Sequence, residues 1–194
     1  MRVSDWIYAE LSLCELYSMQ LDGEVYKPAS NFVACDVPNT PALKLSQLIP
    51  YDSLRYAACG LTALWVHGLA NRPNENSIAL RGKHRADHFY LHNFTVREIA
   101  YLRHDENKIG EHFVLSPVRA MLEVCSDPSL QEHAAVMATA TALSELPHLR
   151  RELHDRAKIS RSAFSTLLRE RLSLADAIDV IDGFDSPHGI EHAL

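Results

Sequence analysis

Glycine is scarce in this chain, and the motifs that mark common enzyme classes are missing. Only 7 of the 194 residues are glycine, so a glycine-rich loop that cradles phosphate is not expected. The chain has no G-x-S-x-G nucleophile elbow, no Walker loop and no H-E-x-x-H zinc motif. We therefore predict that the protein is not an enzyme and uses no cofactor.

Long apolar runs and paired cysteines are also missing. No run reaches the roughly 18 apolar residues of a membrane-spanning helix, and no charged-then-apolar leader opens the chain. We therefore expect a cytoplasmic protein with no membrane partner. The cysteines form no C-x-x-C pair and lie in apolar stretches, which favours reduced core residues over a disulfide or a zinc site. They are Cys14, Cys35, Cys59 and Cys125.

An excess of positive charge is absent as well. The formal net charge is -6, which argues against a protein that mainly coats nucleic acid but leaves a local basic patch open. Residues 150–171 hold seven Lys and Arg against three acidic residues. Within them, I-S-R-S-A-F-S-T-L-L-R resembles the turn and recognition helix of a helix-turn-helix. The alternative is a basic amphipathic helix pair on the surface. The candidate DNA-binding residues are Arg150, Arg151, Arg161, Ser162, Ser165 and Arg169.

The order of patterns predicts an α+β fold, with a small mixed sheet packed on helices and a helical C-terminal third. The first unit, residues 1–36, is expected to hold a helix at 10–21 followed by a β-hairpin built from 24–27 and 31–35. This hairpin is either wing-like or a cover over the core. Two prolines then mark a linker, and Pro41 is expected to open a short helix.

The second unit, residues 37–127, is the predicted α/β core. A buried helix is expected from Gly60 or Thr62 to Leu69, and a further helix should begin at the N-cap Ser116 with Pro117 in its first turn. The expected strands are 77–81, 88–92, 99–103 and 109–115. The predicted core residues are Trp65, Val66, Leu69, Val114, Leu115 and Leu122.

The third unit, residues 128–194, is predicted to be helical throughout. Helices are expected at 128–146 and 147–157, and a third should begin at Ser160 or Ser162. A capping-box variant at Ser173–Asp176 predicts a fourth helix, which Gly183 would end. Its acidic residues recur every three positions and predict a solvated face: Asp176, Asp179, Asp182 and Asp185.

Histidine is abundant, with 11 residues. His84, Asp87 and His88 form the one group that suggests a metal-dependent nuclease, although their spacing matches no standard site and no metal is expected. His88 and His92 are otherwise polar residues at a strand edge. His67 stands before Gly68 at a predicted helix end, where an imidazolium would interact with the negative end of the helix dipole.

The order of motifs between about residues 10 and 126 resembles the AbiEi-type antitoxins of type IV toxin–antitoxin systems. The motifs are T-A-L-W-V-H-G-L, S-I-A-L-R-G, H-F-Y-L-H-N-F, R-E-I-A-Y-L-R-H and L-S-P-V-R-A-M-L-E-V-C. The last differs from the family pattern at Ala120 and Glu123, and the residues before Gly23 are too few for a complete winged helix. The resemblance implies a non-enzymatic antitoxin and transcriptional regulator that opposes a nucleotidyltransferase-type toxin and binds its own operator DNA. The alternative is a protein-interaction module that keeps the antitoxin core without binding DNA.

Overall fold

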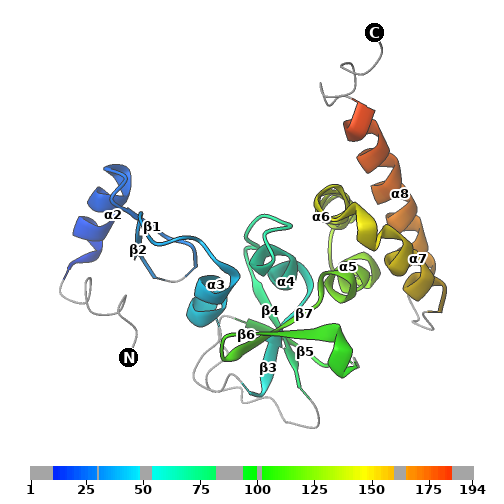
Figure 1. Ribbon diagram of the computed structural model, residues 1–194, viewed down its shortest axis with the longest axis horizontal. Helices are drawn as coiled ribbons and strands as arrows, with labels where there is room; N and C mark the ends of the chain where they lie inside the picture. The colour runs from blue at the N-terminus through cyan, green and yellow to red at the C-terminus, as the bar shows by residue number, and fades with distance from the viewer. Residues whose placement is uncertain are drawn as a thin grey trace.

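The computed structural model describes residues 11–29, 31–48, 54–81, 94–99, 102–159 and 165–184. These residues form an α+β fold in which a five-stranded mixed sheet packs on helices and the C-terminal part is helical (Figure 1). A separate two-stranded hairpin lies near the N-terminus. The predicted fold class is therefore confirmed. No helix among the described residues is long and apolar enough to cross a membrane.

The first elements form a unit that we call the N-terminal arm, residues 11–37. It contains helix α2 (Leu13–Leu21) and the antiparallel strands β1 (Val25–Tyr26) and β2 (Val33–Ala34), as the sequence predicted. Its own small cluster is built from Leu16, Val25 and Phe32. Figure 1 shows the arm to one side of the sheet, joined to it through α3.

Local chemistry explains why α2 begins where it does. The Ser12 side chain accepts a hydrogen bond from the Glu15 backbone N–H, and the Glu15 carboxylate accepts one from the Ser12 N–H at 2.7 Å. This reciprocal capping box satisfies two N–H groups that a helix start otherwise leaves unpaired. Hydrogen bonds from the Ser12 hydroxyl, also at 2.7 Å, and from the Ser12 backbone N–H to this carboxylate lower the pKa of Glu15.

A few contacts hold the arm against the rest of the molecule. Ala29, in the hairpin connection, is fully buried in the main core cluster, and its carbonyl accepts a 2.7 Å hydrogen bond from Arg72. The Asn31 backbone N–H donates to Gln47 on helix α3 (Pro41–Leu48). The connection of the hairpin therefore covers part of the core, while α2 lies further out.

The sheet has the strand order β5-β4-β3-β7-β6. The β3–β4 and β6–β7 pairs are antiparallel, whereas the β3–β7 and β4–β5 pairs are parallel. The strands are β3 (Tyr56–Ala58), β4 (Asn76–Leu80), β5 (Phe94–Arg97), β6 (Glu106–Ile109) and β7 (His112–Leu115).

Three of the four strands predicted for the α/β core differ from the structure or lie outside its described residues. The strand predicted at 99–103 does not form in its described part, since Ile99 and Leu102 belong to no strand and Arg103 begins the 3-10 turn η2 (Arg103–Asp105); residues 100 and 101 lie outside the described residues. The single strand predicted at 109–115 is a hairpin, since Gly110 adopts a φ of 61° and turns the chain between β6 and β7. The predicted strand 88–92 lies outside the described residues.

Helix α4 (Gly60–Val66) packs on the sheet and on helix α5 (Pro117–Ser126). Trp65, Val66 and Leu69 are buried, as predicted. The buried Lys44 of α3 donates a 2.7 Å hydrogen bond from Nζ to the Trp65 carbonyl, and Nζ also lies 5.1 Å from the centre of the Trp65 ring. Burial lowers the pKa of Lys44, and this contact replaces part of its lost hydration.

His67 is the C-cap of α4, as its place before Gly68 suggested. The side chain is partly buried, and its Nε2–H donates a 2.8 Å hydrogen bond to the Leu115 carbonyl on β7. Burial is the main cause that lowers the pKa of His67, which disfavours the imidazolium expected at this helix end. The side chain joins α4 to β7 as a hydrogen-bond donor.

Helix α5 begins as predicted, with the Ser116 side chain accepting from the Arg119 N–H and Pro117 in the first turn. The next helix, α6 (Glu132–Glu145), begins later than the predicted residue 128. The reason is a local turn in which the Asp127 carboxylate accepts hydrogen bonds from the backbone N–H and the hydroxyl of Ser129, at 2.9 and 2.7 Å.

The last elements are η3 (Pro147–Leu149), α7 (Arg150–Ile159) and α8 (Ser165–Phe184). The predicted helix start at Ser173–Asp176 is wrong, because α8 runs through these residues without a break. Leu172 and Ala175 are buried on either side of Ser173, and α8 packs along α6. This packing overrides the local capping signal.

One main core connects the sheet to the C-terminal helices. Val114, Leu115 and Leu122 are buried in it, as predicted, together with Leu153 of α7 and Leu168 of α8. The four cysteines are free. Cys59 and Cys125 are buried as expected, whereas Cys14 and Cys35 are exposed, because they lie on the outer surface of the arm.

Candidate functional site

The basic segment predicted to bind DNA includes several cations that serve the fold. Arg150 lies 3.4 Å from the Asp176 carboxylate, which also receives a 2.6 Å hydrogen bond from His154. Arg156 contacts both Glu152 and Asp105. Arg150 and Arg156, two of the seven cations of this segment, are therefore paired with carboxylates within the structure.

Arg171 is the most deeply buried of these cations. Its guanidinium donates to the carbonyls of Asp127 and Leu130, at 2.7 and 2.8 Å, just beyond the end of α5. These carbonyls have no helical partner of their own, so Arg171 satisfies them from α8. Its position in the sequence resembles that of a surface cation, and no local pattern signals this role.

The remaining candidate DNA-binding residues are distributed as follows. Arg151 on α7 and Arg169 on α8 are exposed, and Arg150 is partly buried. Ser165 is the first residue of α8. Arg161 and Ser162 lie outside the described residues, as does the turn of the predicted helix-turn-helix. The predicted acidic face is wrong at Asp176, which is partly buried and paired with Arg150 and His154.

A cavity of about 570 Å³ lies where β5, η2, α5, α7 and α8 meet. Its volume falls within the range that is typical of small-molecule sites. Apolar side chains form part of the wall, and charged side chains form the rest. The lining residues are Arg97, Ile99, Leu102, His104, Asp105, Arg119, Leu122, Glu123, Ser126, Asp127, Pro128, Arg156 and Leu168.

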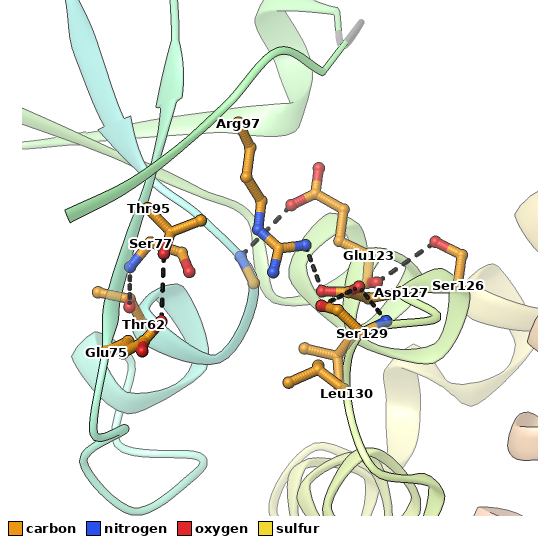
Figure 2. Close-up of polar contacts among 12 residues, drawn as sticks. Thr62, Glu75, Ser77, Thr95, Arg97, Glu123, Ser126, Asp127, Ser129 and Leu130 are labelled. Carbon is orange, nitrogen blue, oxygen red and sulfur yellow. Dashed lines mark hydrogen bonds and ion pairs between the residues drawn. The ribbon is translucent and has the colours of Figure 1, made fainter. Parts of the chain in front are cut away.

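Three arginine–carboxylate pairs dominate the polar part of the cavity. Arg97 pairs with Asp127, as Figure 2 shows. Arg119 Nε donates to Glu123 at 3.0 Å, and Arg156 Nη1 donates to Asp105 at 2.5 Å. Each pair joins side chains that are exposed by 24–30% on the arginine side and by only 6–7% on the carboxylate side.

Glu123 has the most perturbed carboxyl group of the cavity. Burial is the main cause that raises its pKa to about 7, although Arg119 and the Gly60 backbone N–H favour the charged form. The Gly60 N–H stands at the start of α4, where the N-cap Cys59 offers no side-chain cap. Glu123 on α5 therefore caps α4 across the core (Figure 2).

Asp127 and Asp105 behave in the opposite way. Burial alone would raise both pKa values, but hydrogen bonds outweigh it and lower them. For Asp127 these bonds come mainly from Ser129 and Arg97, and for Asp105 from the Leu102 N–H and Arg156. Both carboxylates are therefore charged at neutral pH, and both hold an arginine at the cavity wall.

The described part of the chain contains no group of three His, Cys, Asp or Glu residues that is arranged to hold a metal ion. The residues of the alternative nuclease site, His84, Asp87 and His88, lie outside the described ranges. So does His92.

The arm presents an apolar surface that the sequence analysis did not single out. Leu13, Tyr17 and Leu21 follow one another at a spacing of four residues along α2, so they share one face. They are exposed by 66%, 49% and 90%. The Tyr17 ring rests edge-on against Phe32 at 5.2 Å, which fixes the middle of this stripe. The signal was present in the sequence as a second apolar spacing on the predicted helix.

No protein-family model, no curated protein and no solved structure matches this chain.

Proposed function

We propose that this protein is a non-enzymatic, AbiEi-like antitoxin and regulator that acts by binding a protein partner through its N-terminal arm. The partner in this proposal is a nucleotidyltransferase-type toxin, and the location is the cytoplasm. The order of motifs in the sequence supports the antitoxin part. The observation that carries the partner-binding part is the exposed apolar stripe of Leu13, Tyr17 and Leu21 on α2.

The stripe is costly to leave in water and useful in an interface. Fully burying one leucine side chain contributes about 1.5–3 kcal/mol, and Leu13 and Leu21 are both mostly exposed. Tyr17 adds an aromatic side chain of the kind that is enriched in interfaces. Because the three side chains share one face of a capped helix, a partner can cover them together with little ordering of the arm.

The charge of the arm favours a protein over DNA as its partner. Exposed carboxylates lie on and around α2 and the hairpin, at Glu15, Asp22, Glu24 and Asp36, and Lys27 is the single cation among residues 11–37. Lys27 lies over the rings of Tyr17 and Phe32. An acidic surface repels phosphates, so a wing-like DNA contact by this hairpin is disfavoured. A partner with an apolar groove and a basic rim would complement it.

The test is neutralisation of toxicity in cells. A nucleotidyltransferase encoded beside this gene, which the proposal requires, would be expressed with the wild type, with the double variant Leu13→Asp/Leu21→Asp, or with Leu174→Asp. Leu174 is an exposed leucine on α8 and provides a matched control. We expect growth to be restored by the wild type and the control and to be lost with the double variant, because charges on the stripe prevent its burial.

Two outcomes would contradict this proposal. If the double variant, shown to be folded by circular dichroism, neutralises as well as the wild type, the stripe is not the partner surface. If the wild type neutralises no neighbouring toxin and purifies without a partner, the antitoxin assignment is wrong.

Operator DNA is a second candidate partner, supported by the exposed Arg151 and Arg169 in the segment that resembles a helix-turn-helix. A gel shift with the DNA upstream of the gene tests it. Each phosphate contact removed by Arg151→Ala or Arg169→Ala should reduce the slope of log affinity against log salt by about 0.9. If folded protein does not bind this DNA at low salt, operator DNA is excluded and the protein partner is the remaining candidate.

A further inference from the structure

Three guanidinium groups reach the cavity beside α5 from three different elements. Arg97 comes from β5, Arg119 from α5 and Arg156 from α7. Their carboxylate partners are the more deeply buried members of the three pairs. The carboxylates therefore hold the arginines from the protein side, and the guanidinium groups form the more accessible part of the polar wall.

Arg97 pairs with Asp127 through one end of its guanidinium, and its side chain is still 26% exposed at the cavity. Its Nε–H is enclosed by the protein, so a ligand in the cavity would have to be held by the terminal nitrogens of the guanidinium.

The other wall of the cavity is apolar. Leu122 of α5, Leu168 of α8 and Ile99 after β5 line it, with Pro128 beyond the end of α5. Such surfaces are suited to a ring or short hydrocarbon, and the volume of about 570 Å³ accommodates a molecule of that size. The cavity thus combines a cationic wall and an apolar wall.

We propose that this cavity binds a small anion that has an apolar body, with its phosphate or carboxylate group on Arg97 and its body against Leu122 and Leu168. Planar guanidinium groups match these oxyanions because they can donate two parallel N–H bonds. The cavity lies apart from the arm, so this proposal does not depend on the proposed partner surface. Such an anion would be a small-molecule effector of the protein.

The preference for an anion rests on accessibility. Each of the three arginine side chains is exposed by 24–30%, whereas its carboxylate partner in the cavity is exposed by only 6–7%.

Calorimetric titration of the purified full chain tests the proposal. The probes are phenyl phosphate and benzoate, which join an oxyanion to a ring, and inorganic phosphate, which lacks the ring. We expect saturable 1:1 binding of at least one ring-bearing anion. Phenyl phosphate alone would assign a phosphate ligand, and benzoate alone a carboxylate. Binding of inorganic phosphate should be about ten-fold weaker, because the apolar contact is lost.

Two variants place the binding in the cavity. Arg97→Gln should weaken the titrated anion about ten-fold or more, the effect of losing a hydrogen bond to a charged group. Ser126→Phe introduces a ring into the cavity and should abolish binding. Ser144→Phe is the matched control, because both serines donate to the carbonyl three residues earlier near the end of a helix, but Ser144 is exposed on α6.

The proposal is wrong if neither ring-bearing anion binds below about 1 mM. It is also wrong if folded Ser126→Phe binds as well as Ser144→Phe, which would place the anion elsewhere. Equal affinity for inorganic phosphate and phenyl phosphate would contradict the apolar half of the site. Because Arg97→Gln leaves Asp127 unpaired and can reduce stability, the serine pair gives a result that does not depend on it.

Discussion

Arg156 on α7 donates a 2.5 Å hydrogen bond to the carboxylate of Asp105, which stands 51 residues earlier in the turn before β6. The Asp105 backbone carbonyl also accepts a 2.7 Å hydrogen bond from the Ser116 N–H, at the start of α5. Asp105 therefore connects its own turn, η2, to helix α7 and to the start of α5. One ion pair joins the C-terminal helices to the edge of the sheet.

Loss of Arg156 should destabilise the fold. Arg156→Ala leaves the buried Asp105 carboxylate without this charged hydrogen bond, and we expect the free energy of unfolding in urea to fall by about 1.5–3 kcal/mol. Lys158→Ala on the same helix is the control, since its exposed pair with Asp155 should contribute less than about 1 kcal/mol. Equal effects of the two variants would contradict the role assigned to Arg156.

Glu123 should make stability depend on pH near neutrality. Its pKa is raised by burial to about 7 in the folded protein, above the ordinary value of about 4.3 in an unfolded chain. The folded state therefore holds the proton more tightly, so this contribution to stability is full below about pH 4 and is lost as the pH rises through about 7. We expect a loss on the order of 1–3 kcal/mol across this range.

The matched variant for this prediction is Glu123→Gln. Glutamine cannot titrate, but its amide oxygen can still accept the hydrogen bond from the Gly60 N–H. Urea unfolding at about pH 5 and about pH 8 should show a smaller decline in stability for the variant than for the wild type. A decline of the same size in both proteins would show that other groups cause it.

The Trp65 side chain should contribute strongly to stability. It is buried between α3 and the core, with Lys44 and Arg72 over its ring. Trp65→Ala should reduce the free energy of unfolding by about 3–5 kcal/mol, whereas Leu54→Ala, at an exposed leucine, should have little effect. A change below about 1 kcal/mol at Trp65 would mean that the ring is not part of the core.

Arg171 and Arg169 on α8 should differ in their contribution to stability, because Arg171 is buried in the fold and Arg169 is exposed. Arg171→Ala removes the donors to the carbonyls of Asp127 and Leu130 and should cost about 2–4 kcal/mol. Arg169 is exposed, so Arg169→Ala should change stability by less than about 0.5 kcal/mol. Thermal unfolding of both variants at one pH measures the difference. A similar loss in both would mean that Arg171 is not a specific cap.

Local patterns predicted the elements whose boundaries depend on neighbouring residues. Ser116 and Pro117 start α5 as expected, because an N-cap acts within one helical turn. The hairpin after Gly23 also follows from its own residues, since the glycine adopts a φ of 78°. In each case the decisive contact is close in sequence, so a reading of the chain can find it.

Long-range contacts decided what the patterns missed. Strand β3 consists of Tyr56, Ala57 and Ala58, a sequence with little strand signal, and it forms because β4 and β7 pair with it on both sides. The capping box expected at Ser173 fails because α6 packs against the residues around it. Tertiary packing overrides local propensity in both places.

The candidate sites divide in the same way. The spacing of Leu13, Tyr17 and Leu21 was visible in the sequence, whereas the arginine–carboxylate pairs were not. Only Arg119 and Glu123 are close enough in the chain to be recognised as a pair at helical spacing. Asp105 and Arg156 are brought together by the fold, and no sequence spacing predicts their contact.

The cap that Arg171 places on the end of α5 bears on how the protein folds during its synthesis on the ribosome. The carbonyls of Asp127 and Leu130 leave the ribosome roughly forty residues before the side chain that satisfies them, which corresponds to a few seconds of synthesis at typical rates. During that interval the end of α5 lacks the hydrogen bonds that Arg171 donates, and it gains them only when α8 emerges and docks.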